Sequence, residues 1–104
     1  MKYTVYQINR ERDAERVKFR SYGCTMREAG RINPEIYDKV YEGEIEQVST
    51  QEKDEWTLER IFKTLNTNKR PSDFKGHSLS VSDIVELDGV RWFCDICGWK
   101  RLEA

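Results

Sequence analysis

The order of hydrophobic and polar positions along the chain predicts a small α+β domain that starts with a strand. From Lys2 to Ile8, β-branched and tyrosine residues face both sides, with Tyr3, Val5 and Gln7 on one of them. Such a pattern predicts an inner strand that is buried on both faces. A second strand is predicted from Val17 to Tyr22, where apolar and basic residues alternate before Gly23.

Helical spacing appears twice in the middle of the chain. Asn33-Pro34 predicts a short helix containing Ile36, Tyr37, Val40 and Tyr41, because Asn caps helices and proline suits the first helical position. A weak third strand is predicted over 44–48. Residues 49–52 match a capping box, and they precede the clearest helical stripe, formed by Leu58, Ile61, Phe62 and Leu65.

A hairpin is predicted at the C-terminal end. Residues 84–87 and 90–94 are short β-rich runs, and Asp88-Gly89 between them tolerates the positive φ of a two-residue turn. Residues 74–83 lead into this hairpin without helical spacing. The expected fold is therefore one α+β domain over 1–104, an antiparallel or mixed sheet with the 50–65 helix packed on one face.

Length and composition narrow the class of protein. A chain of 104 residues holds one modest core, and no apolar run approaches the roughly 18 residues that cross a bilayer. The N-terminus has no long apolar stretch of a secretion signal, and three cysteines fit a reducing compartment better than a disulfide framework. We expect a cytoplasmic protein that does not bind membranes.

The net charge of −1 hides a separation of charge along the chain. Residues 1–31 hold eight basic and four acidic residues, whereas residues 32–59 hold two and nine. Such blocks can be solvated surface or can steer charged partners. Interleaved aromatics make the basic block a candidate RNA-binding surface, comprising Arg10, Arg12, Arg16, Lys18 and Arg20. The acidic block with Trp56 is a candidate protein-binding face, comprising Glu42, Glu44, Glu46, Glu52, Asp54, Glu55, Trp56 and Glu59.

The sequence offers little for catalysis or metal binding. Cys94 and Cys97 have ligand spacing, but Cys24 and His77, which would complete a zinc site, are isolated. His77 is the only histidine, and we interpret it as a loop residue bonded to backbone rather than as a base for Ser78, Ser80 or Cys94. We assign no catalytic residue, no metal and no cofactor, and we expect a protein that is not an enzyme.

Three segments resemble YodL-like domains: 3–8 (YTVYQI), 74–85 (FKGHSLSVSDIV) and 93–99, where Phe93-Cys94-Asp95 is followed by Gly98-Trp99. The resemblance covers nearly the whole chain, although Cys97 departs from the pattern. It implies an accessory protein of mobile DNA, carried by Firmicutes and their plasmids, phages and conjugative elements, without a catalytic assignment that holds for the whole family.

Size and the C-terminal hairpin are also similar to small inhibitors of type II-A CRISPR systems. This looser resemblance implies a partner, Cas9 or its guide RNA, and a function, impeding guide-RNA loading or complex assembly. The acidic block suits the basic channel that holds guide RNA, and the basic block suits the RNA itself. Two alternatives remain open. One is a module that binds a host cytoskeletal or conjugation protein; the other is a small nuclease that cuts guide RNA with His77 and Asp83 or Asp73.

Overall fold

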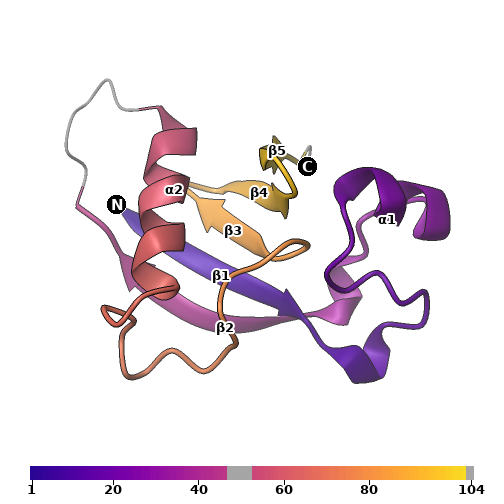
Figure 1. Cartoon of the computed structure of the whole chain (residues 1–104), viewed down its shortest axis with the longest axis horizontal. Coiled ribbons are helices and arrows are strands. Elements are labelled where there is room, and N and C mark those ends of the chain that lie inside the picture. The colour runs from indigo at the N-terminus through magenta and orange to yellow at the C-terminus, as the bar shows by residue number, and fades with distance from the viewer. Residues whose placement is uncertain (47–52, 103–104) are drawn as a thin grey trace.

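The computed structural model describes residues 1–46 and 53–102. It contains five strands, two α-helices and two 3₁₀ turns (Figure 1). In chain order these are β1 (Lys2–Ile8), η1 (Arg10–Arg12), α1 (Tyr22–Ala29), η2 (Pro34–Ile36), β2 (Tyr37–Glu44), α2 (Asp54–Leu65), β3 (Ile84–Leu87), β4 (Val90–Asp95) and β5 (Gly98–Arg101).

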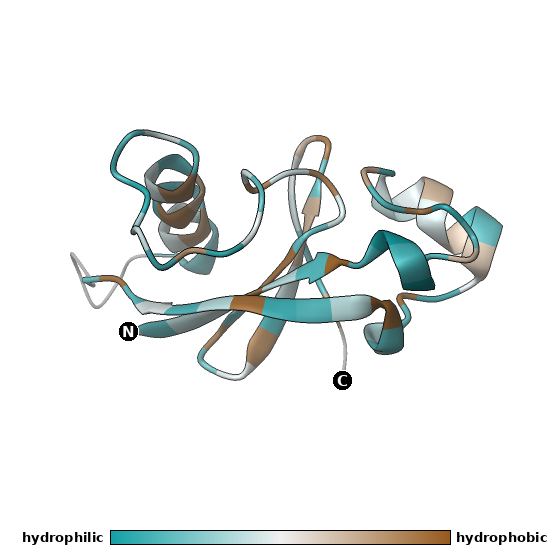
Figure 2. Cartoon of the chain, turned by 90° about the horizontal axis from the view of Figure 1, so that it is seen from below, coloured by the Kyte–Doolittle hydropathy of each residue, from teal (hydrophilic) through white to brown (hydrophobic). Residues whose placement is uncertain are grey.

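The strands form one antiparallel sheet in the order β2-β1-β3-β4-β5. β1 is an inner strand, as predicted, and Val5 lies opposite Tyr41 of β2 and Val85 of β3. The predicted burial of both faces is wrong, because Thr4 and Tyr6 on the face away from α2 are only half-buried. The expected α+β class is confirmed, and the sheet is antiparallel rather than mixed. α2 crosses one face of the sheet, whereas α1 lies at the other end of the molecule (Figures 1 and 2).

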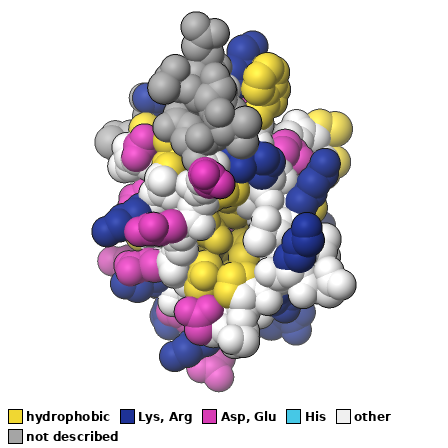
Figure 3. Space-filling view, turned by 90° about the vertical axis from the view of Figure 1, so that its left-hand side faces the viewer, with side chains coloured by type: hydrophobic (Ala, Val, Ile, Leu, Met, Phe, Trp, Pro, Cys, Tyr) yellow, Lys and Arg dark blue, Asp and Glu magenta, His cyan; other side chains and the backbone are white. Residues whose placement is uncertain are grey.

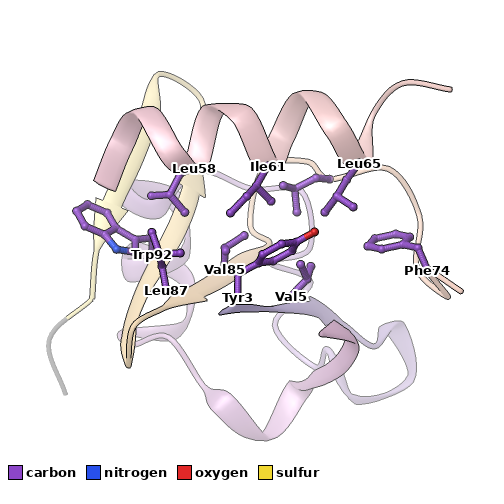
Figure 4. Close-up of a cluster of buried hydrophobic side chains, with 10 residues drawn as sticks. Tyr3, Val5, Leu58, Ile61, Leu65, Phe74, Val85, Leu87 and Trp92 are labelled. Atoms are coloured by element: carbon purple, nitrogen blue, oxygen red, sulfur yellow. The ribbon is translucent and has the colours of Figure 1, made fainter. Parts of the chain in front are cut away.

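The main core lies between α2 and the sheet (Figure 4). Leu58, Ile61 and Leu65 of α2 are fully buried, so the predicted apolar stripe is the face that packs. In Figure 2 the hydrophobic side of α2 turns toward the strands. Burying each of these side chains stabilises the fold by about 1.5–3 kcal/mol. The sheet and the loop before β3 supply the other buried members of this cluster, Tyr3, Val5, Phe74, Leu79, Val85, Leu87 and Trp92.

The predicted hairpin is confirmed. Asp88 and Gly89 connect β3 to β4 with φ angles of 51° and 79°. Positive φ at both central residues defines a type I′ turn, whose twist matches that of the flanking strands. The chain then turns again into β5, a strand that the sequence did not predict, where Trp99 lies opposite Cys94.

The prediction of a strand over 17–22 is wrong. The carboxylate of Asp13 accepts hydrogen bonds from the amides of Val17 and Lys18, both at 2.9 Å, which curls the segment into a turn. Phe19 then has a φ of 67°, outside the range of a strand. Ser21 accepts from the amide of Cys24 and begins α1 instead, so a capping hydroxyl and a local carboxylate outweigh the alternating pattern.

The prediction of a short helix after Asn33-Pro34 is also wrong beyond the first turn. Only η2 is helical, and β2 follows because the open edge of β1 needs a hydrogen-bonding partner. The register shifts between Val5 and Tyr6, which leaves Val40 unpaired as a bulge. The strand predicted over 44–48 overlaps β2 only at Glu44, where β2 ends. Residues 47–48 of that prediction and the capping box predicted at 49–52 lie outside the described residues.

No helix in the described part of the chain is long and apolar enough to cross a membrane.

Candidate binding site around the loop before β3

The loop before β3 is held by a side chain from β1. Gln7 donates from Nε2 to the carbonyl of His77 at 2.9 Å and to Oδ2 of Asp83 at 3.0 Å. Its Oε1 accepts from the amide of His77 at 3.2 Å. Gln7 is 3% exposed and continues the inward-facing positions of β1. The alternation along β1 placed Gln7 on that side but did not reveal its role; a polar residue at an inward position was the available signal.

Gly76 allows this close approach. A Cβ at position 76 would lie 2.1 Å from Oε1 of Gln7 and 3.1 Å from a methyl carbon of Val40. Any larger residue would therefore displace the amide of Gln7. This is the structural reason for a glycine immediately before His77.

Asp83 is the buried acid of the site. Its side chain is fully inaccessible, and Oδ2 accepts from Gln7 and from the amide of Ser80, the latter at 2.9 Å. Oδ1 is buried with no hydrogen-bond partner among the described residues. Burial raises the pKa of Asp83 to about 7, because it opposes the charged form more strongly than the two hydrogen bonds favour it.

His77 lies in the loop as a backbone-bonded residue, as the sequence interpretation expected. Its Nδ1 lies 2.7 Å from the carbonyl of Ser78, and since a carbonyl only accepts, Nδ1 carries the proton. Nε2 is buried and has no partner in the described part of the chain. Burial lowers the pKa of His77, and the nearby positive charges of Lys18, Arg10 and Arg70 lower it further.

An exposed aromatic ring surrounded by cations lies beside His77. The ring of Phe19 is 46% exposed and makes an edge contact with His77, with 5.4 Å between centroids. Arg10 and Lys18 lie over the same ring, at 5.9 and 5.3 Å from its centroid. Arg70 reaches the same loop and donates to the hydroxyl of Ser78 at 2.6 Å. We call Arg10, Lys18, Phe19, Arg70 and His77 the Phe19 patch.

The structure therefore brings together only part of the predicted basic surface. Arg12 pairs with Asp38 and donates to the carbonyl of Glu35, which occupies its guanidinium. Arg16 and Arg20 are exposed, and the cations over the ring of Phe19 are those of Arg10 and Lys18 instead. Arg70, which sequence analysis missed, joins the patch from the segment that follows α2. No local pattern could have placed it beside residues about 50 positions earlier in the chain.

The predicted acidic residues do not form one face in the described part of the chain. Glu42, Glu44 and Glu46 lie on or just after β2, at one edge of the sheet. Glu59 accepts from the indole of Trp99 on β5, the opposite edge, at 2.9 Å. Acidic and basic side chains are interspersed on the face shown in Figure 3. Asp54 and Glu55 begin α2, and Glu52 lies outside the described residues.

Trp56 remains an exposed aromatic residue. It is 59% exposed on the first turn of α2, with the ammonium of Lys53 at 5.9 Å from its ring. A large exposed ring is typical of interface anchors.

The three cysteines do not come together with other ligands. Cys94 is buried, Cys97 is exposed, and no group of three His, Cys, Asp or Glu that could hold a metal is found within 1–46 and 53–102. Burial raises the pKa of Cys94 to about 12, which keeps its thiol protonated at neutral pH.

Neither the curated proteins nor the solved structures include a match to this chain. A family model matches it almost from end to end, over residues 2–104, and that match includes all three segments noted in the sequence. The chain is a member of the YodL-like domain family.

Proposed function

We propose that this YodL-like domain is a non-catalytic binding module of mobile DNA that inhibits Cas9 by contacting its guide RNA and impeding guide loading. The observation that carries the proposal is the Phe19 patch. An exposed ring flanked by Arg10 and Lys18 offers a stacking surface and phosphate contacts together. Guide RNA is loaded in the cytoplasm, so the proposal places the protein there.

The acid in the same loop as the patch does not pair with its cations. Both oxygens of Asp13 accept from the amides of Val17 and Lys18. The guanidinium of Arg10 and the ammonium of Lys18 form no ion pair within the described residues. They remain available to a phosphate backbone.

The geometry of His77 and Asp83 favours binding over cleavage. Asp83 is fully buried, and the free nitrogen of His77 is buried as well. A general base has to reach the proton that it removes, directly or through one water. Asp73, the other acid considered for a nuclease, lies near Tyr3 and Tyr41, and its charge raises the pKa of both phenols.

The test uses purified protein with labelled guide RNA, apo-Cas9 and the guide-loaded complex. We expect the protein to bind guide RNA and to reduce formation of the loaded complex. The double variant Arg10→Glu with Lys18→Glu should bind guide RNA at least tenfold more weakly, roughly the effect of reversing two phosphate contacts. A matched control is Lys63→Glu with Lys69→Glu, which makes the same charge change on exposed residues of α2 and the following loop.

Equal loss in both double variants would show that overall charge and not the Phe19 patch binds the RNA. Absence of binding to guide RNA, apo-Cas9 and the loaded complex would refute the proposal. Intact labelled RNA after long incubation, with or without a chelator, is the expected result for a protein that does not cut it.

Trp56 supports a second candidate, a protein partner. Its exposed ring and the acids Asp54 and Glu55 beside it suit a basic groove on Cas9, or a host cytoskeletal or conjugation protein. Trp56→Ala should then reduce recovery of the partner in a pull-down by at least tenfold without reducing RNA binding. An unchanged pull-down would end this candidate.

A further inference from the structure

A groove with a volume of about 910 Å³ lies on the sheet face that α2 leaves uncovered. Tyr6 and Ile84 form part of its floor, and they alternate with Val5 and Val85, which face α2. Tyr22 of α1 forms a wall, where its ring contacts Phe93 edge-on at 5.7 Å. The volume is at the upper end of the range of ligand pockets, about 300–1,000 Å³.

Aromatic rings and positive charge alternate in the groove. The guanidinium of Arg91 lies 5.0 Å from the ring centroid of Tyr6, and the ammonium of Lys100 lies 5.4 Å from that of Tyr22. Each cation is therefore held next to a tyrosine ring. All the charged lining residues in the described part of the chain are basic: Arg31, Arg91, Lys100 and Arg101.

Only one of the lining cations forms an ion pair within the described residues. Arg91 donates to Glu86 at 3.1 Å. Arg31 and Lys100 form no ion pair among residues 1–46 and 53–102. The groove therefore presents a net positive charge to an occupant.

The third tyrosine is fixed in place. The hydroxyl of Tyr37 donates to the carbonyl of Ser82 at 2.6 Å, which anchors the ring at the side of the groove nearest the 76–83 loop. Burial raises the pKa of Tyr37, so its phenol stays neutral. A fixed ring loses little conformational freedom when a flat group stacks on it.

We propose that this groove binds an unpaired stretch of single-stranded RNA, with bases against the tyrosine rings and phosphates at Lys100 and Arg31. Base–aromatic stacking beside a cationic track is how proteins hold single strands without reading their sequence. A duplex hides the faces of its bases within the stack, so it cannot use the rings. This inference rests on the proposed RNA binding and deepens it, because it names the form of RNA that the domain takes.

The three tyrosine rings beside the cations favour RNA over an acidic peptide as the occupant. An acidic peptide would match the cations but would leave the three tyrosine rings without a flat partner. Its binding is therefore the comparison that the experiment needs.

The experiment measures anisotropy of a fluorescein-labelled oligouridine of about ten nucleotides, a length within the usual site sizes. The same strand annealed to oligoadenosine and a labelled polyglutamate peptide of equal length are measured in parallel. We expect the wild-type protein to bind the single strand at least tenfold more tightly than either comparison.

Lys100→Glu with Arg31→Glu should weaken binding of the single strand by roughly tenfold or more. Lys63→Glu with Lys69→Glu is again the matched control, expected to change affinity by less than about threefold. Tyr6→Leu should weaken binding about fivefold and Tyr6→Phe should restore it, since stacking needs a ring and not a hydroxyl. Thermal unfolding of each variant shows whether it is folded.

Equal losses in the groove variant and the control, equal binding of strand and duplex, or equal binding of polyglutamate would each overturn the inference. Arg10→Glu with Lys18→Glu separates this failure from that of the proposed function. If only this variant loses binding, the Phe19 patch binds RNA and the groove does not. If only the groove variants lose binding, the assignment of RNA to the Phe19 patch fails. A wild-type protein that binds no strand refutes both.

Discussion

Phe19 and Ser82 stabilise each other's unusual backbone. Both have positive φ angles, 67° and 83°, and the amide of Phe19 donates to the hydroxyl of Ser82 at 2.9 Å. The two residues are 63 positions apart in the chain. Positive φ is uncommon for residues other than glycine, so the bond joins two strained turns and fixes the exposed ring of Phe19 beside His77.

The first prediction concerns Ser82→Ala. Without the hydroxyl, the partly buried amide of Phe19 loses its acceptor, and we expect the free energy of unfolding to fall by about 1–2 kcal/mol. Urea denaturation measures the change. Ser80→Ala is the control, because the Ser80 hydroxyl makes only an exposed bond to Ser78 at 3.3 Å, and its loss should cost less than about 0.5 kcal/mol. Similar losses for both variants would contradict the role of the Phe19–Ser82 bond.

The second prediction concerns pH and Asp83. Its pKa is about 7 in the folded protein and 3.8 as an ordinary value, so the folded state holds this proton more tightly. The contribution of protonated Asp83 to stability is complete below pH 4 and is lost as pH rises toward 7. Between these values the free energy of unfolding of the wild type should fall by on the order of 2–4 kcal/mol.

Asp83→Asn isolates this effect, because the amide keeps an oxygen for Gln7 and Ser80 and does not titrate. The difference in stability between wild type and variant should change between pH 4 and 7 and then stay constant up to pH 9. Asp38 and Glu42, whose pKa values are lowered by Arg12 and Lys39, titrate equally in both proteins. A difference that does not vary with pH would show that Asp83 is ionised throughout.

The third prediction compares two glycines. Gly76→Ala places a methyl group where Oε1 of Gln7 now lies. We therefore expect the free energy of unfolding to fall by about 2–4 kcal/mol, and the amides of the loop before β3 to be less protected from hydrogen exchange. Gly23→Ala is the control, since nothing lies within 4 Å of the added Cβ in α1, and it should stabilise the protein by up to about 1 kcal/mol. Thermal unfolding ranks the variants, and a Gly76→Ala protein as stable as wild type would mean that Gln7 can move aside freely.

The fourth prediction concerns thiol reactivity. Cys97 is exposed, Cys24 is partly buried, and Cys94 is buried with a raised pKa, so iodoacetamide should label them in that order. Mass spectrometry of peptides after brief labelling measures the rates. Under denaturing conditions the three should react at similar rates. Early labelling of Cys94 in the native protein would show that the end of β4 opens readily.

Much of the architecture was predictable because local patterns carry it. The stripe of Leu58, Ile61 and Leu65 identified α2, and Asp88-Gly89 identified the hairpin. In both cases the residues that decide the structure are neighbours in the chain, so period and turn chemistry were sufficient.

The segment from Tyr37 to Tyr41 shows where a local pattern misleads. The spacing of these two tyrosines suggested one face of a helix. In β2 they face opposite sides of the sheet, because the bulge at Val40 shifts the alternation by one residue. The bulge arises from pairing with β1, which begins 35 positions before Tyr37.

The candidate binding site depends almost wholly on distant contacts. Gln7 reaches His77 and Asp83 across 70 and 76 positions, and Arg70 joins Arg10 and Lys18 around His77. No spacing in the sequence encodes these partners, since their meeting depends on β1 pairing with β3.

The sequence by itself determined the helix that packs on the sheet, the inner strand and the terminal hairpin. Only the tertiary structure decided which cations surround Phe19, which carboxyl is buried, and that Glu42 and Glu59 lie at opposite edges of the sheet. The physical reason is that backbone preference and amphipathic period act within a few residues. Burial and charge depend instead on which surfaces the completed sheet brings together.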